Sequence, residues 1–133
     1  MRYAVAYIVT ALVFLGFDFI WLTQVALGMY RRELAGLLLD QPNLLIAGLF
    51  YLLFVAGLVI LAVVPALNGG SWVNALLMGA VLGLVAYGTY DITNLSTLKG
   101  WSLTVTLADL AWGTVLSSLA ATAGYFAVTS LGL

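Results

Sequence analysis

Three carboxylates stand within or at the edge of long apolar stretches: Asp18, Asp91 and Asp109. A carboxylate inside a bilayer costs at least a few kcal/mol, so such residues usually face a bundle interior and serve a function. A tryptophan follows two of them at three positions, Trp21 after Asp18 and Trp112 after Asp109. Residues three apart are neighbours on a helix. Each indole could shield its acid from lipid, donate its N–H or form a pocket wall, although Trp21 equally suits an interfacial aromatic belt.

The densest polar stretch of the chain lies between residues 87 and 101. Side chains of this type can cap the ends of two neighbouring helices, because they satisfy unpaired backbone groups. They can also build a ligand site at the mouth of a pocket. The members that fit a ligand or proton site are Tyr87, Tyr90, Asp91 and Asn94, to which the first and last stretches add Asp18, Trp21, Asp109 and Trp112.

Composition excludes several kinds of chemistry. The net charge is −1, so the chain has no basic surface for nucleic acid. It has neither cysteine nor histidine, which excludes disulfides, thiolate chemistry and a Ser-His-Asp site. Acid–base chemistry must therefore use carboxylates, tyrosine or lysine, and a metal would need oxygen ligands. We expect no metal and no cofactor.

Only 7% of the residues are charged and 65% are hydrophobic, whereas a soluble domain carries about 25% charged residues. A bilayer core needs roughly 20 apolar residues in a helix. The sequence therefore predicts an all-α integral membrane four-helix bundle, with residues 1–133 as a single domain in the lipid bilayer. The expected spans are 3–27, 43–64, 72–91 and 102–131, the second ending before Pro65 because proline cannot continue a helix.

The segment 28–40 between the first two spans is amphipathic. Tyr30, Leu34, Leu37 and Leu38 fall on one helical side, with the charged residues away from it. This pattern is typical of a short helix that lies in the membrane interface. We expect its apolar side to contact lipid headgroups or the bundle edge, although a polar loop fits the same length.

The helical stripes of the spans predict which faces pack. Asp109, Gly113, Leu116, Ala120 and Gly124 share one stripe of the last span. The first span aligns Tyr7, Ala11, Phe14, Asp18 and Val25, and the third carries Gly79-x-x-x-Gly83, a spacing that permits close helix approach. Asp91 is offset from Gly79 by about 120°, which places it near the edge of that face.

Asp18 and Asp109 have similar expected depths. They lie roughly 14 Å and 12 Å from the same membrane boundary at 1.5 Å per residue. We therefore expect the two acids to converge across the bundle, with Tyr90 or Asn94 above them. No intramembrane base is available to neutralise them, so we expect at least one to be protonated at neutral pH.

Positive charge in the short loops predicts the orientation. Arg31, Arg32 and Lys99 lie on one side of the membrane, and Arg2 with the terminal amine on the other. The connections 28–42 and 92–101 are then cytoplasmic, both termini are periplasmic, and Lys99 and Trp101 mark the cytoplasmic interface. The first stretch exceeds the apolar region of a cleaved signal peptide, so we expect it to remain as a span.

Two specific motifs carry a family resemblance: Tyr90-Asp91-Ile92-Thr93-Asn94 in the polar run and Asp109-Leu110-Ala111-Trp112-Gly113 in the last span. Together with the segments 18–22 and 50–58, they closely resemble a family of small bacterial inner-membrane proteins catalogued as domain of unknown function 2177. The resemblance covers essentially the whole chain. It implies a four-span, multi-pass protein of the bacterial inner membrane and supplies no activity, ligand or catalytic residue.

The residues themselves leave three kinds of function open. The first is a bundle that binds or transports a small ligand or cation with proton linkage, which at this size predicts a homodimer. The second is a membrane-embedded enzyme that acts on a lipid or isoprenoid. The third is an accessory subunit in which the acids only form hydrogen bonds between helices.

Overall fold

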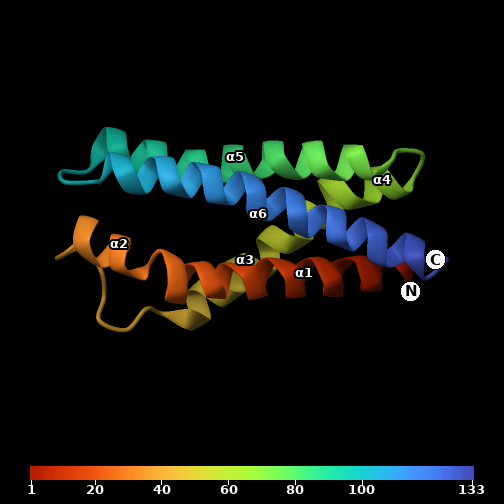
Figure 1. Cartoon of the computed structure of the whole chain (residues 1–133), viewed down its shortest axis with the longest axis horizontal. Coiled ribbons are helices and arrows are strands. Elements are labelled where there is room, and N and C mark those ends of the chain that lie inside the picture. Colours follow the sequence, from red (N-terminus) through yellow and green to blue (C-terminus); the bar gives the residue numbers. More distant parts are fainter.

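In the computed structural model, which describes all residues from 1 to 133, the chain forms four long apolar helices and a short helix between the first two. Each long helix is long and apolar enough to cross a membrane, which confirms the predicted all-α four-span architecture. The long helices are Arg2–Val25, Leu44–Leu67, Trp72–Thr97 and Leu103–Ser130. Both termini lie at one end of the bundle, and the short helix lies at the other (Figure 1).

The first two long helices each contain a π-helical turn. Their parts are α1 (Arg2–Ile20) with η1 (Trp21–Val25), and α3 (Leu44–Leu58) with η2 (Val59–Val63) and α4 (Val64–Leu67). The prediction that the second helix ends before Pro65 is wrong. Pro65 has no N–H for the carbonyl one turn back, but the wider turn of η2 accommodates this loss and the chain stays helical.

The helix α5 (Trp72–Thr97) is longer than the predicted 72–91. The polar run forms the last turns of α5. Hydroxyl groups of this run donate hydrogen bonds to backbone carbonyls of the same helix. Ser96 Oγ and Thr97 Oγ1 each donate to the Thr93 carbonyl at 2.8 Å. The other end of α5 is fixed by a capping box between Ser71 and Asn74.

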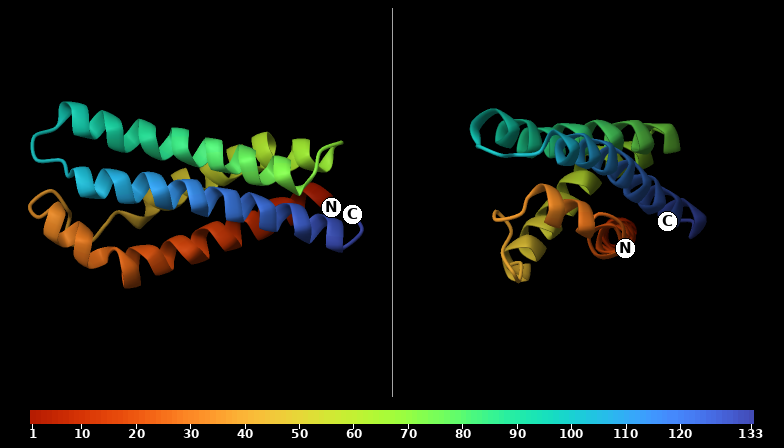
Figure 2. Two further views of the ribbon diagram at one scale, coloured as in Figure 1. Left: turned by 45° about the horizontal axis from the view of Figure 1, so that its top comes forward. Right: turned by 60° about the vertical axis from the view of Figure 1, so that its left-hand side comes forward.

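The last helix, α6 (Leu103–Ser130), lies between α5 and α1 (Figure 2). Glycines allow this close contact: a Cβ on Gly83 would stand 2.2 Å from the Gly113 carbonyl oxygen. On the α1 side, Gly124 of α6 lies directly against Thr10. The predicted stripe of α6 is buried throughout, which confirms that it is the packing face.

The predicted stripe of the first helix is correct for most of its length and wrong at its end. Ala11, Phe14 and Asp18 are buried and Tyr7 is half-buried, whereas Val25 is 64% exposed. The π turn explains the difference, because the Ala26 N–H bonds to the Trp21 carbonyl five residues back and shifts the helical register.

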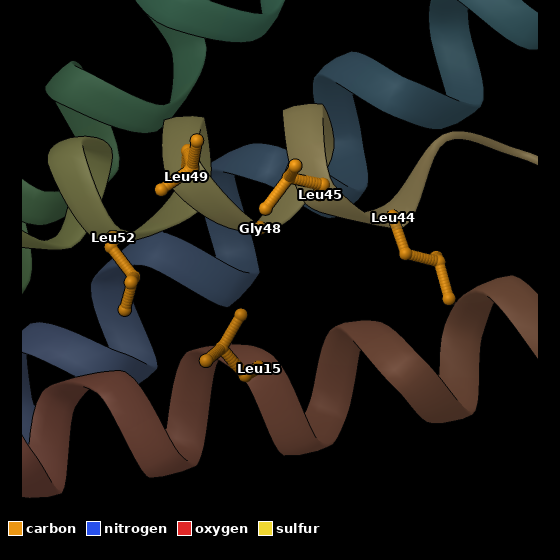
Figure 3. Close-up of a pocket in the computed structure, with 6 residues that line it drawn as sticks. All are labelled: Leu15, Leu44, Leu45, Gly48, Leu49 and Leu52. Atoms are coloured by element: carbon orange, nitrogen blue, oxygen red, sulfur yellow. The ribbon is translucent and has the colours of Figure 1, made fainter.

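The helix α3 crosses the bundle obliquely. It begins beside α1, and its continuation through η2 and α4 ends beside α5. An apolar groove of about 310 Å³ lies between α1 and the first turns of α3 (Figure 3). Its lining residues are Leu15, Leu44, Leu45, Gly48, Leu49 and Leu52. The helix is thus least closely packed in the half that faces the short helix.

Candidate functional site

A cavity of about 770 Å³ lies within the half of the bundle that ends at the short helix α2 (Leu27–Glu33). It is lined by residues of α1, α3, α5 and α6, together with Tyr30 of α2 and with Leu34 and Leu38 just beyond that helix. Most of its lining is apolar or aromatic. The residues with polar groups in the lining are Asp18, Trp21, Tyr30, Tyr51, Tyr87, Thr89, Tyr90, Trp101, Asp109 and Trp112.

Asp18 and Asp109 are joined by a crossed set of hydrogen bonds. The Trp112 indole N–H of α6 donates to Asp18 Oδ1 of α1 at 3.0 Å. In return, Trp21 Nε1 donates to the Tyr30 hydroxyl at 3.0 Å, and that hydroxyl donates to Asp109. Trp112 therefore donates to the acid of α1, and Trp21 is linked through Tyr30 to the acid of α6. Neither tryptophan bonds to the acid three residues before it. The expected convergence of the two acids is thus present in the geometry.

The two indoles of this set stack on each other. The Trp21 and Trp112 rings lie 4.7 Å apart between centroids and 7° from parallel. Such a pair adds to the energy of packing beyond its buried area. The stack thus positions one indole that donates to Asp18 and another that donates to the Tyr30 hydroxyl, which in turn donates to Asp109.

Tyr30 reaches the cavity because the chain bends toward α6 after η1 (Figure 1). The short helix α2 follows the buried Ala26, and Leu34 beyond it is only 4% exposed. Burial, and next the hydrogen bond to Asp109, raise the pKa of the Tyr30 hydroxyl, so it remains a donor at neutral pH. A short helix here was predicted, with its apolar side at lipid headgroups or at the bundle edge. The hydrogen bond of the Tyr30 hydroxyl to Asp109 places this residue against the bundle.

Asp91 is fully buried, and neither of its carboxylate oxygens accepts a hydrogen bond. The expectation that it lies at the edge of the α5 face is therefore wrong. The helices α5 and α6 contact each other along a row of residues four apart, and Asp91 continues that row. Its carboxyl faces that of Asp109, while the nearby Trp101 indole donates to Thr106 Oγ1 at 3.1 Å.

The remaining predicted residues divide into two groups. Tyr87 packs its ring against Gly113 and lines the cavity. Tyr90 also lines the cavity, and its ring makes an edge-to-face contact with that of Trp101, with 5.6 Å between the ring centroids. Asn94 is half-buried on α5 and does not line the cavity. The basic residues Arg31, Arg32 and Lys99 are exposed at this end of the molecule and do not line it either.

Sequence reasoning missed two tyrosines of the site. Tyr30 lies among leucines on the apolar side of the segment 28–40. Its hydroxyl, a polar group on that apolar side, is the feature that could have identified it as a site residue. Tyr51 is the only polar side chain from Leu44 to Leu67, and it lies beside Asp18 and against the Phe14 ring at 5.8 Å. A lone hydroxyl in an otherwise apolar span indicates a buried partner, since burying it unpaired is costly.

The arrangement offers carboxylates in an aromatic and apolar enclosure. It can neutralise a positive charge or take up protons, and its tyrosine hydroxyls can donate to a carboxylate or a ligand. The chain has no group of three or more acid, histidine or cysteine side chains close enough together to hold a metal ion.

Comparison with known proteins gives one match. No curated protein and no solved structure matches the chain. A family described as "Predicted membrane protein (DUF2177)" matches it over residues 3–126, which include all four long helices apart from a few terminal residues. The chain therefore belongs to this family of polytopic membrane proteins, whose description gives no activity.

Proposed function

We propose that the cavity binds a small hydrophobic organic cation in exchange for protons. One observation carries the proposal: Asp18 and Asp109 line a largely aromatic cavity in which no lysine or arginine takes part. A carboxylate in such a place needs a positive partner, because burial without one is costly. The partner can be a proton when the cavity is empty and a cation when it is filled.

The aromatic lining supports a cation with apolar substituents. The faces of tryptophan and tyrosine attract cations, more strongly where water is excluded. The stacked pair of Trp21 and Trp112 borders the cavity next to both acids, and Tyr51 and Tyr87 complete the wall. The volume of about 770 Å³ falls within the roughly 300–1,000 Å³ typical of small-molecule sites.

We further propose that the chain acts in the bacterial inner membrane as a homodimer if it moves its ligand across. Four helices around one cavity at one end of the bundle are few for a complete path across the membrane, so this version of the function predicts a second copy. The alternative functions make different predictions. If the acids only join helices, no cation competes with protons, and an enzyme acting on a lipid would convert a neutral substrate instead.

The test is binding of tetraphenylphosphonium to the purified protein in detergent micelles, followed by equilibrium dialysis. We expect affinity to rise with pH, because protons compete for the carboxylates that the cation needs. Asp109→Asn and Asp18→Asn should each weaken binding at mildly alkaline pH by about tenfold or more, which corresponds to about 1.4 kcal/mol. Asp40→Asn is the matched control, since Asp40 is exposed and outside the cavity.

Two results would contradict the proposal. The first is an affinity that does not change with pH. The second is equal binding by the wild-type protein and both cavity variants, which would place the cation elsewhere.

A further inference from the structure

Asp91 is the buried acid that the cavity does not explain. It is 0% exposed, neither oxygen accepts a hydrogen bond, and it does not line the cavity. A bare carboxylate in this position would be costly, because burial without a partner leaves its charge uncompensated. The group must therefore be neutralised by something that these contacts do not supply.

The register of α5 against α6 identifies its neighbour. The two helices are antiparallel, and their close contacts advance by four residues on each helix. These contacts are Gly79 with Ala121, Gly83 with Ser117, and Tyr87 with Gly113. The next step of the series pairs Asp91 with Asp109, and the two carboxyl groups face each other across the contact between the helices.

Two facing carboxyl groups can form a hydrogen bond only if one of them carries a proton. Nothing else in their surroundings can supply positive charge. The titratable groups that face the pair are Asp18 from α1, Tyr30 from α2, Tyr51 from α3, and Tyr87 and Tyr90 from α5. All of these are neutral or negative, so a single shared proton is the arrangement that avoids two adjacent buried charges.

We propose that Asp91 and Asp109 share one proton and that Asp91 conducts this proton out of the bundle when a cation binds to Asp109. The coupling to a cation rests on the function proposed above, whereas the shared proton does not. Charge balances in the exchange, since one cation enters the site as one proton leaves it. Asp91 is fully buried and does not line the cavity, whereas Asp109 does. The helix α5 ends at Thr97, roughly 9 Å further along the helix axis from Asp91.

The shared proton is tested without any ligand, by infrared spectroscopy of the protein in lipid bilayers at neutral pH. The measurement uses the Asp18→Asn variant, so that Asp91 and Asp109 are the only buried acids left. We expect the carbonyl band of a protonated carboxyl, sensitive to exchange into D2O. The further change Asp91→Asn should abolish it, because the amide donates to Asp109 without an added proton, and Asp91→Glu should restore it. Asp40→Asn should leave it unchanged.

The coupling is tested by proton release into weak buffer during tetraphenylphosphonium binding. We expect about one proton per bound cation for the wild-type protein. Asp91→Asn should still bind the cation while it releases none, and its affinity should lose most of its dependence on pH.

The outcomes separate the two ideas. A missing band, or a band that persists unchanged in Asp91→Asn, overturns the shared proton even if the cation binds. A band with the expected changes but no cation binding supports the shared proton and overturns the proposed function. Equal proton release by wild type and Asp91→Asn overturns the role of Asp91 in the exchange.

Discussion

At the scale of single residues, the crossed hydrogen bonds decide how the acids are held. The Trp112 N–H of α6 donates a hydrogen bond to Asp18, which is only 4% exposed. Because water reaches this carboxyl poorly, loss of the donor leaves an acceptor that is hard to satisfy. The energetic value of the bond is therefore larger than that of the same bond at a surface.

We predict that Trp112→Phe lowers the free energy of unfolding by about 1–3 kcal/mol, because Asp18 loses its buried donor. Phenylalanine keeps an aromatic face against Trp21, so most of the packing is retained. The measurement is reversible unfolding in mixed micelles, followed by helix circular dichroism. The control is Trp72→Phe at the other end of the bundle, where the ring is 46% exposed and we expect a change below about 0.5 kcal/mol. Equal effects of the two changes would show that the N–H to Asp18 contributes little.

The sequence was informative about residues where charge or size is unusual. Asp18 and Asp109 stood out because acids are rare in apolar spans, and the α6 stripe placed Asp109 on a buried face. Tyr30 could not be found in this way, because its position depends on how the chain bends toward α6 after η1. Asp91 was placed too near the edge, because a single straight helix was assumed where two helices contact along a row of residues four apart.

At the scale of elements, contact between α5 and α6 determines how close the other helices can come. Gly83 allows the α5 backbone to meet that of α6 at Gly113, and this contact also sets the register of Asp91 and Asp109. The hydrophobic pattern predicted which segments are helices, but it could not predict the π turns. At Pro65 the absent N–H was read as a helix end, although a wider turn allows the helix to continue.

We predict that Gly83→Ala lowers the free energy of unfolding by about 1–3 kcal/mol, because its Cβ overlaps the α6 backbone and forces the helices apart. The matched control is Gly88→Ala in the same helix, where a Cβ meets nothing within 4 Å. That change should raise stability by up to about 1 kcal/mol, since alanine favours the helix over glycine. Unfolding in mixed micelles measures both, and destabilisation of equal size would argue against a special contact at Gly83.

At the scale of the whole molecule, the cavity and three of the four basic side chains lie at the same end. The exposed Arg31, Arg32 and Lys99 are on the α2 side, and both termini are at the opposite end (Figure 1). Hydropathy predicted the four membrane spans. It could not predict that α6 lies between α5 and α1, because this position depends on the close contacts that the α6 glycines make with both helices. The orientation in the membrane follows from the charge asymmetry and stays a prediction.

We predict that both termini face the periplasm, because positively charged loops stay in the cytoplasm. Alkaline phosphatase fused to either terminus should be active in cells, whereas a fluorescent protein that matures only in the cytoplasm should remain dark there. The same two reporters inserted after Lys99 should give the opposite result. Fluorescence from the terminal fusions would invert the topology and place the cavity on the periplasmic side.

The stacked indoles of Trp21 and Trp112 also have an optical consequence. Two stacked chromophores 4.7 Å apart are close enough for their electronic transitions to couple, so they absorb as a pair. Any ligand that separates the rings would change their near-ultraviolet absorption, while one that fits beside them would leave this coupling intact. The protein therefore contains a label-free optical probe of its cavity, located between the two acids whose occupancy is in question.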